Sequence, residues 1–393
     1  MTRADREQPT GRTTWIWTPL TSFVGRAEDT AEIARLLDEH RLVTVTGPGG
    51  VGKTRLAAEV ALRMGSQFPD GIWFIELGPV TDVAHVATEV MSALGIQQHP
   101  GTPPLEALAE ALAPRRLLFI LDNCEHVLPA VADICVILLG RADEVRILAT
   151  SREQLGMGDE RRYRLAPLEL PDSDELAVVS QSAAAALFTE RARQADPRFP
   201  LDDESAPLVT RVVTGLDGMP LAIELAAARV EALGIVGLAE RLGDALRLLT
   251  RGDPLAAERH RSLAAVADWS YQLLTEPEQR AFRRLAVLAG PFTLAAAQSV
   301  AGPDAGLIAA RLVDCSLLVP PRTGADGRTR YRMLQSLRAY ALARLREAGE
   351  ERQATAAMAA AARSAVERVA AELRPARTGN VTPCSAWMPR MPF

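Results

Sequence analysis

Gly47-Pro48-Gly49-Gly50-Val51-Gly52-Lys53-Thr54 matches the pattern G-x4-G-K-[ST], which is typical of a phosphate-binding loop. The glycines of such a loop let backbone N–H groups turn inward on an anion, and the helix that follows points its positive dipole end at the same anion. Lys53 is the only lysine in a 393-residue chain that has 44 lysines and arginines together. An ammonium is a compact charge that fits between phosphate oxygens, whereas a planar guanidinium does not. We therefore predict a phosphate site in which Thr54 reaches Mg²⁺.

The segments around this loop predict a strand before it and a helix after it. Arg41–Thr46 is an apolar run rich in β-branched residues, which suits a strand buried on both faces of a parallel sheet. Arg55–Met64 has helical spacing. Further strands are expected at Gly71–Leu77, Leu117–Leu121, Val145–Thr150 and Arg162–Leu165, with amphipathic stretches at 82–94, 104–113 and 128–138. This alternation predicts a doubly wound α/β domain with the parallel sheet of a P-loop NTPase.

The second half of the chain predicts a different architecture. Residues 175–249 are alanine- and leucine-rich helices, and residues 260–347 are a second helical block. A hairpin-like segment, Ser316–Met333, interrupts that block, and helices followed by a short hairpin are the outline of a winged helix. We divide the chain into a disordered lead-in (1–17), a P-loop nucleotide-binding domain (18–168), a helical lid domain (169–250), a winged-helix domain (251–346), a C-terminal helix (347–373) and a disordered tail (374–393).

Two further motifs are expected at the carboxyl edge of the predicted sheet. Asp122 ends the apolar run Leu117–Leu121, so its carboxylate lies where ligands bind in open α/β sheets and can hold Mg²⁺. Asn123 follows, and an amide cannot accept a proton from water, so we expect at most a slow ATPase. Glu125 could substitute, although its position favours the start of the next helix. Arg152 can reach a γ-phosphate and distinguish ATP from ADP, the alternative being a solvated loop arginine.

Bulk composition excludes several classes of protein. The net charge of −5 and the pI near 5.7 carry no nucleic-acid signature for the whole chain. Four cysteines without paired spacing indicate a reducing compartment, and the histidines form no zinc constellation with them. The N-terminus has no apolar signal segment, and no run approaches 18 apolar residues. We expect a cytoplasmic protein that does not interact with membranes.

Taken together, the segments resemble the STAND class of signalling nucleotide switches, in particular the NB-ARC-like ATPase module of bacterial AfsR-type and LuxR-type large regulators. The resemblance runs from about Thr18 to Arg346. It rests on TPLTSFVGR (18–26), LVTVTGPGGVGKTRLA (42–57), LLFILDNCEHV (117–127), ILATSRE (147–153), LDGMPLAIELAAARV (216–230), HRSLAAVADWSYQLL (260–274) and YRMLQSLRAYALARL (331–345).

The resemblance implies ATP and ADP as ligands, with Mg²⁺ held by Thr54 and Asp122. It implies that a winged helix folds over bound ADP and that Pro220 packs on the base from the lid. The family's Met-His-Asp motif aligns with Met333-Leu334-Gln335, and Leu334 cannot hydrogen-bond a phosphate. The expected nucleotide-binding residues are Val24, Gly25 and Arg26 on the adenine side and Gly47, Gly49, Gly50, Val51, Gly52, Lys53, Thr54 and Arg55 at the loop, while Lys53, Asp122 and Arg152 would serve any hydrolysis.

Three functions remain open from the sequence. The first is an ATP/ADP-controlled switch in transcription or signalling, with a protein partner or self-assembly in the ATP state and without the family's sensor and effector domains. The second is a winged-helix, initiator-like ATPase that binds DNA, permitted by the 14 arginines against 8 acids of residues 251–346. Arg280, Arg283 and Arg284 would then contact DNA. The third is a turnover enzyme such as a small-molecule kinase, for which no acceptor motif is visible.

Overall fold

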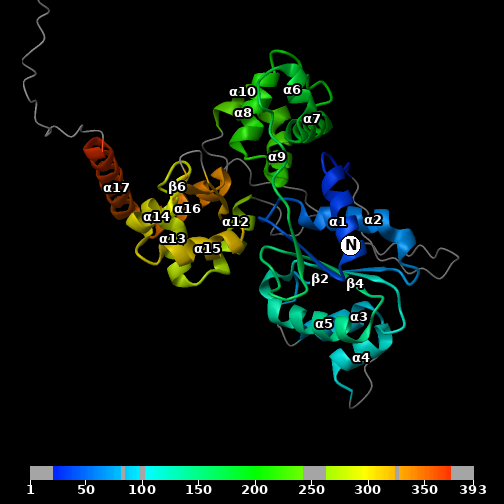
Figure 1. Cartoon of the computed structure of the whole chain (residues 1–393). Coiled ribbons are helices and arrows are strands. Elements are labelled where there is room, and N and C mark those ends of the chain that lie inside the picture. Colours follow the sequence, from blue (N-terminus) through cyan, green and yellow to red (C-terminus); the bar gives the residue numbers. More distant parts are fainter. Residues whose placement is uncertain (1–20, 81–84, 97–101, 242–262, 324–326, 373–393) are drawn as a thin grey trace, which may run out of the picture.

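Five strands form one parallel sheet in the first half of the chain (Figure 1). The computed structural model describes residues 21–80, 85–96, 102–241, 263–323 and 327–372, so the predicted lead-in and tail lie outside the described residues. The strand order is β2-β3-β4-β1-β5, and every neighbouring pair is parallel. The strands are β1 (Leu42–Thr46), β2 (Ile72–Glu76), β3 (Leu118–Asp122), β4 (Arg146–Ser151) and β5 (Arg161–Arg164). All five predicted strands and the α/β fold class are confirmed.

Helices cover both faces of this sheet (Figure 1). Leu118 and Ile120 of β3 pack with the face that carries α1 and α2, whereas Phe119 and Leu121 pack with the opposite face. Every residue of β1 and β3 is buried, as expected for strands between two helical layers. The helices are α1 (Ala27–Glu39) and α2 (Lys53–Met64) on one face, with the 3-10 turn η1 (Gly65–Gln67), and α3 (Val86–Ala93), α4 (Pro104–Leu112) and α5 (Leu128–Arg141) on the other.

A second group of helices follows the sheet and contains no strand among the described residues 169–241. Its core is continuous with the α1–α2 side of the sheet. The helices are α6 (Leu176–Gln181), α7 (Ala183–Ala195), α8 (Ala206–Gly215), α9 (Pro220–Ala227) and α10 (Val230–Glu240). We call this group the lid. The turn between α8 and α9 brings the lid back towards the sheet, as the backbone contacts described below show.

The third group has the helices and three-stranded antiparallel sheet of a winged helix. The predicted hairpin is present as β7 and β8, although residues 324–326 of its turn lie outside the described residues. The elements are α12 (Leu263–Gln272), α13 (Glu276–Leu285), β6 (Phe292–Thr293), α14 (Leu294–Ala301), α15 (Ala305–Asp314), β7 (Val319–Thr323), β8 (Thr329–Arg332) and α16 (Gln335–Glu347). A capping box between Thr275 and Glu278 starts α13.

The last helix, α17 (Glu351–Glu372), is separated from α16 by Gly349, whose φ of 69° places it in the left-handed region that ends a helix. It packs against α14 and α16 and extends away from the rest of the molecule (Figure 1). Within the described segments, none of the helices combines the length and apolar character needed to cross a bilayer.

Candidate functional site

The glycine-rich loop connects the interior strand β1 to α2 and has the backbone shape that its sequence predicts. Gly50 and Gly52 have φ values of 81° and 99°, in the left-handed region that side chains disfavour. A Cβ added at Gly50 would lie 3.0 Å from Leu221 Cβ, whereas a Cβ at Gly52 would face open space. The first turn of the 12-residue helix α2 follows directly and presents its free N–H groups to the loop. The loop is therefore shaped to surround an anion.

Lys53 lies against this loop. Its Nζ donates hydrogen bonds to the carbonyl oxygens of Gly47 at 2.8 Å and Pro48 at 3.2 Å. Desolvation of the ammonium lowers the pKa of Lys53 to about 8, so the side chain still carries most of its charge at neutral pH. A charged donor that is hydrogen-bonded to backbone carbonyls at the mouth of an anion cradle is well placed for a phosphate.

Asp122 and two threonines form a cluster of oxygen atoms at the end of β3. Asp122 Oδ1 accepts hydrogen bonds from Thr54 Oγ1 at 2.8 Å and from Thr150 Oγ1 at 2.5 Å. Burial raises the pKa of Asp122 to about 6, while the two threonine hydrogen bonds oppose that rise. Carboxylate and hydroxyl oxygens are the donors that Mg²⁺ prefers. Together with the glycine cradle, this donor set fits a magnesium nucleotide, with Thr54 and Asp122 as the residues that would hold the metal.

Arg152 and Glu125 form a buried ion pair beside that cluster. Arg152 Nε lies 2.8 Å from Glu125 Oε1, and the two side chains are 8% and 2% exposed. Arg152 is therefore not a solvated loop arginine. As expected, Glu125 lies in the first turn of the next helix, which is the short 3-10 helix η3 (Cys124–His126), and α5 starts at Leu128. Asn123, with a φ of 66°, turns the chain away from a helical path.

The expected adenine-side residues connect the loop to neighbouring segments. Arg26 is buried, and its guanidinium donates to the carbonyl oxygens of Val51 at 3.3 Å and Ala166 at 2.8 Å. Gly25 has a φ of 70°, and an added Cβ would lie 2.4 Å from Ala183 Cβ of the lid. Val24 packs partly buried against the core.

Arg55 and Pro220 are the two remaining residues that were predicted to bind nucleotide. Arg55 donates to Thr21 Oγ1 at 2.9 Å and lies over the ring of Phe23, so its side chain is directed towards the N-terminal segment. Pro220 is the first residue of α9 and is partly buried, as expected for a proline at a helix start.

The turn between α8 and α9 touches the phosphate loop through its backbone. Leu221 N–H donates to the carbonyl oxygen of Gly50 at 3.2 Å, and Leu168 N–H donates to that of Gly218 at 2.9 Å. Asp217 and Gly218 are both left-handed, with φ values of 53° and 66°. This turn therefore connects the phosphate loop, the end of the sheet domain and the lid.

The same turn also holds the winged helix, through a residue that the sequence analysis missed. Asp217 is 5% exposed, and its Oδ1 accepts from Arg332 Nη1 of β8 at 2.9 Å. Its Oδ2 accepts from the backbone N–H of Gln335, the first residue of α16. The Asp-Gly pair at 217–218 signals a turn, but no local pattern signals a partner more than 100 residues away.

The winged helix also docks on the sheet domain itself. Ser316 Oγ donates to the carbonyl oxygen of Arg152 at 2.7 Å in a buried contact. Arg164 of β5 donates to the carbonyl oxygens of Val313 and Leu318 at 3.3–3.4 Å, and Arg311 of α15 pairs with Glu153. We call these contacts, with those of Asp217, the winged-helix junction.

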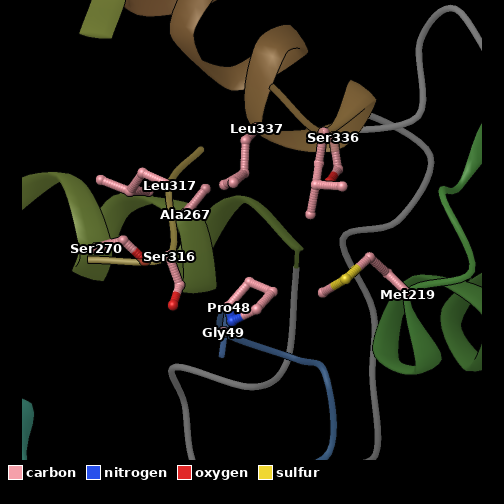
Figure 2. Close-up of a pocket in the computed structure, with 10 residues that line it drawn as sticks. Pro48, Gly49, Met219, Ala267, Ser270, Ser316, Leu317, Ser336 and Leu337 are labelled. Carbon is pink, nitrogen blue, oxygen red and sulfur yellow. The ribbon is translucent and has the colours of Figure 1, made fainter. Parts of the chain in front are cut away.

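A small cavity lies where the three groups of elements meet (Figure 2). Pro48 and Gly49 of the phosphate loop face Met219 of the lid and Ser316 and Leu337 of the winged helix across it. Leu334 also lines it and is 3% exposed. The cavity volume of about 10 Å³ is close to that of one water site. The winged helix and lid therefore close over the tip of the phosphate loop in this conformation.

The arginines expected to contact DNA are largely engaged within the protein. Glu350 accepts from Arg283 Nη2 at 2.7 Å and from Arg284 Nε at 3.0 Å. Arg280 lies 3.6 Å from Glu276, and its side chain is 58% exposed. Two of the three therefore join α13 to the start of α17 and do not form an open basic surface.

Comparison with known proteins gives the following matches. The NB-ARC domain family model matches residues 28–161, and the winged helix-turn-helix family model matches residues 274–346. An uncharacterized protein of Mycobacterium tuberculosis is 38% identical over 338 residues, which cover 84% of this chain and 83% of that protein. An inferred HTH-type transcriptional regulator of the same organism is 42% identical over 321 residues, or 80% of this chain and 35% of that protein.

Regulatory protein AfsR of Streptomyces coelicolor is 32% identical over 349 residues, which cover 82% of this chain and 32% of AfsR. The chain thus spans about a third of the length of both regulators. Among solved structures, a Walker-type ATPase of Pyrococcus abyssi superposes with a TM-score of 0.52 at 12% identity, over 86% of this chain and 98% of that one. That likeness concerns the fold alone.

Proposed function

Since the chain belongs to the family of NB-ARC ATPases with a C-terminal winged helix that includes the AfsR-type regulators, we propose that it is a switch set by bound ATP or ADP. The family membership confirms the resemblance inferred from the motifs. In this proposal the output is a change of conformation that acts on transcription, and hydrolysis resets the switch slowly.

One observation carries the proposal: the lid and the winged helix both meet the tip of the phosphate loop. Met219 of the lid and Leu337 of the winged helix share one cavity with Pro48 and Gly49 (Figure 2). A nucleotide bound in the phosphate loop can therefore act on the lid and on the winged helix through direct contact. In the proposed switch, a closed conformation like the one described here exchanges with an open one. A ligand shifts that equilibrium only by the difference in its affinity for the two conformations, and we expect a difference because the loop is covered only in the closed one.

Residues of this chain have distinct roles in the proposal. The loop N–H groups and Lys53 would bind the phosphates, Thr54 and Asp122 would hold Mg²⁺, and Arg152 would respond to the γ-phosphate. Mg²⁺ at that place would neutralise charge on the phosphate oxygens. Val24, Gly25, Arg26 and Pro220 would enclose the base, as the family resemblance implies.

Hydrolysis is expected to be slow because Asn123 stands where a second acid would activate water. A steady-state rate above roughly 1 s⁻¹ would instead favour a turnover enzyme.

The test is to identify the nucleotide that co-purifies and to compare sedimentation with ADP and with a non-hydrolysable ATP analogue, both with Mg²⁺. We expect bound ADP in the purified protein and a different hydrodynamic size, by opening or assembly, with the analogue. Lys53→Ala should abolish the difference. Failure to bind either nucleotide would refute the proposal.

DNA binding by the winged helix is a second candidate, because one relative is named an HTH-type transcriptional regulator and the family model is a winged helix-turn-helix. Since Arg283 and Arg284 are both held by ion pairs with Glu350, we expect their replacement by glutamine to have little effect on any DNA binding. A salt-dependent mobility shift that is lost in the triple variant with Arg280→Gln would favour the α13 surface as the DNA contact.

A further inference from the structure

Glu125 is an acidic group inside the phosphate site that the roles above leave unused. It follows Asp122 by one 3-10 turn, and its side chain is 2% exposed. Oε1 accepts from Arg152 Nε at 2.8 Å, while Oε2 is buried with no hydrogen-bond partner in the described part of the chain. A buried carboxylate with one oxygen unsatisfied is unfavourable for folding, so a purely structural role accounts poorly for it.

The charge of Glu125 acts on both cations that the proposed function assigns to the phosphates. It makes the direct ion pair with Arg152, and it attracts Lys53 more strongly than Asp122 does. Burial alone would raise the pKa of Glu125, but the attraction of Arg152 and Lys53 holds it below its usual value. Glu125 is therefore ionised at neutral pH and places one negative charge between two cations.

We propose that Glu125 stands in for a γ-phosphate and thereby sets the preference of this site for ADP over ATP. The proposal rests on the nucleotide binding proposed above and adds a specificity residue to it. With ADP bound, the Arg152–Glu125 pair can stay as it is. To bind a third phosphate, Arg152 must give up or share Glu125.

Two features of the pair make that exchange unfavourable. The carboxylate is buried, so losing Arg152 would leave its charge without a partner in a site of low polarity. The added phosphate would also bring like charge close to Glu125. Both penalties apply to ATP and neither applies to ADP. They also link nucleotide exchange to the winged helix, because the backbone of Arg152 accepts the hydrogen bond from Ser316.

The decisive variant is Glu125→Gln, which keeps the shape and one acceptor oxygen but removes the charge. Dissociation constants for ADP and for the non-hydrolysable analogue AMP-PNP, both with Mg²⁺, are measured on the full chain by calorimetry. We expect the ratio of the AMP-PNP constant to the ADP constant to fall about tenfold, mainly through tighter AMP-PNP binding. In an Arg152→Gln background the same change should have much less effect.

Glu76→Gln is the matched control. Glu76 pairs in register with Asp122 at the same edge of the sheet but is exposed, so its loss removes equal charge without touching the ion pair. In Glu76→Gln the ratio of the AMP-PNP constant to the ADP constant should stay within about twofold of the wild-type ratio, because exposed charges are screened. If Glu125→Gln does not fold, Glu125→Asp replaces it, since the shorter side chain breaks the 2.8 Å contact and must lower the same ratio.

One result would overturn the inference, and another would refute its premise. An unchanged ratio in a folded Glu125 variant overturns the inference, and if ATP hydrolysis is also slower in that variant, Glu125 is assigned to water activation. Absence of binding of either nucleotide to the wild type refutes the proposed function itself.

Discussion

The phosphate-binding edge of the sheet and the winged-helix junction are built in different ways. At the edge, Asp122, Thr150 and Arg152 lie at the ends of two adjacent strands, so their positions follow from the parallel register of two strands in the interior of the sheet. At the junction, single side chains join segments far apart in the chain, such as Ser316 to Arg152 and Asp217 to Arg332. The edge is part of the sheet itself, whereas the junction joins a separate group of elements to it.

This difference indicates how a switch can work in such a fold. A net intramolecular hydrogen bond contributes roughly 1 kcal/mol, so the polar contacts of the junction oppose its opening by only a few kcal/mol, beside the apolar contacts that the winged helix makes in the shared core. Differential binding of a nucleotide can supply a free energy of that size. The sheet, in contrast, opens only with global unfolding, because its strands are covered on both faces.

The largest effect is expected at Gly218, which belongs to the turn shared by the edge and the junction. In Gly218→Ala the new Cβ would lie 2.3 Å from the carbonyl oxygen of Leu168, at a φ of 66°. We expect a loss of about 3 kcal/mol in the free energy of unfolding, from clash and backbone strain together. Gly156→Ala is the control, because φ is 82° there but the space is open, and it should cost only about 1 kcal/mol. Denaturant titration measures the free energy of unfolding of both variants. Equal losses would show that the structure relieves the clash at Gly218.

Lys53→Ala should affect ligand binding and leave folding intact. Loss of one charged donor to phosphate is expected to weaken ADP binding by about 2 kcal/mol, or roughly thirtyfold. Since the folded state lowers the pKa of Lys53 to about 8, it disfavours the charged ammonium, and the substitution should not reduce stability at neutral pH. Calorimetric titration measures the loss of ADP affinity, and denaturant unfolding tests whether stability is unchanged. Arg63→Ala, at an exposed position of the same helix, is the control, and an equal loss of ADP affinity there would contradict a local role.

The two regions also differ in how far the sequence predicts them. Hydrophobic periodicity and glycine spacing predict the five strands, the loop and Asp122, because these depend on neighbours within a few residues. The ion pair of Glu125 with Arg152 was not predicted, since the two residues are 27 positions apart and only the packed sheet brings them together. No local signal points to the contact partners of Asp217 and Ser316. Their partners are 115 and 164 residues away, and only the packed fold brings them together.

A double-mutant cycle on Asp217 and Arg332 sharpens the view of the junction. Asp217→Asn suits the positive φ of 53° and keeps an acceptor for Gln335 N–H, while Arg332→Gln removes the other charge. We expect a coupling energy of about 1 kcal/mol, because Asp217 is buried and Arg332 is half exposed. Thermal unfolding gives the coupling, and hydrogen exchange at the start of α16 should rise in the single variants. Additive effects would mean that the pair does not hold α16.

The smallest effect is expected from the outer ion pair of the junction, Arg311 with Glu153. Arg311 is 41% exposed and also lies 3.6 Å from Glu278, so solvent and a second partner both weaken its contribution. Arg311→Gln should lower global stability by less than about 0.5 kcal/mol, and less still at high salt.

Because this ion pair joins the winged helix to the sheet domain, its loss should still raise proteolytic sensitivity between the two. Arg280→Gln is the matched control, since its pair with Glu276 lies within α13 and spans no junction. If both variants respond alike to protease, the winged helix is not held as a separable unit. If only Arg311→Gln responds, a contact too weak to matter for unfolding still affects opening, as expected where opening and unfolding are separate equilibria.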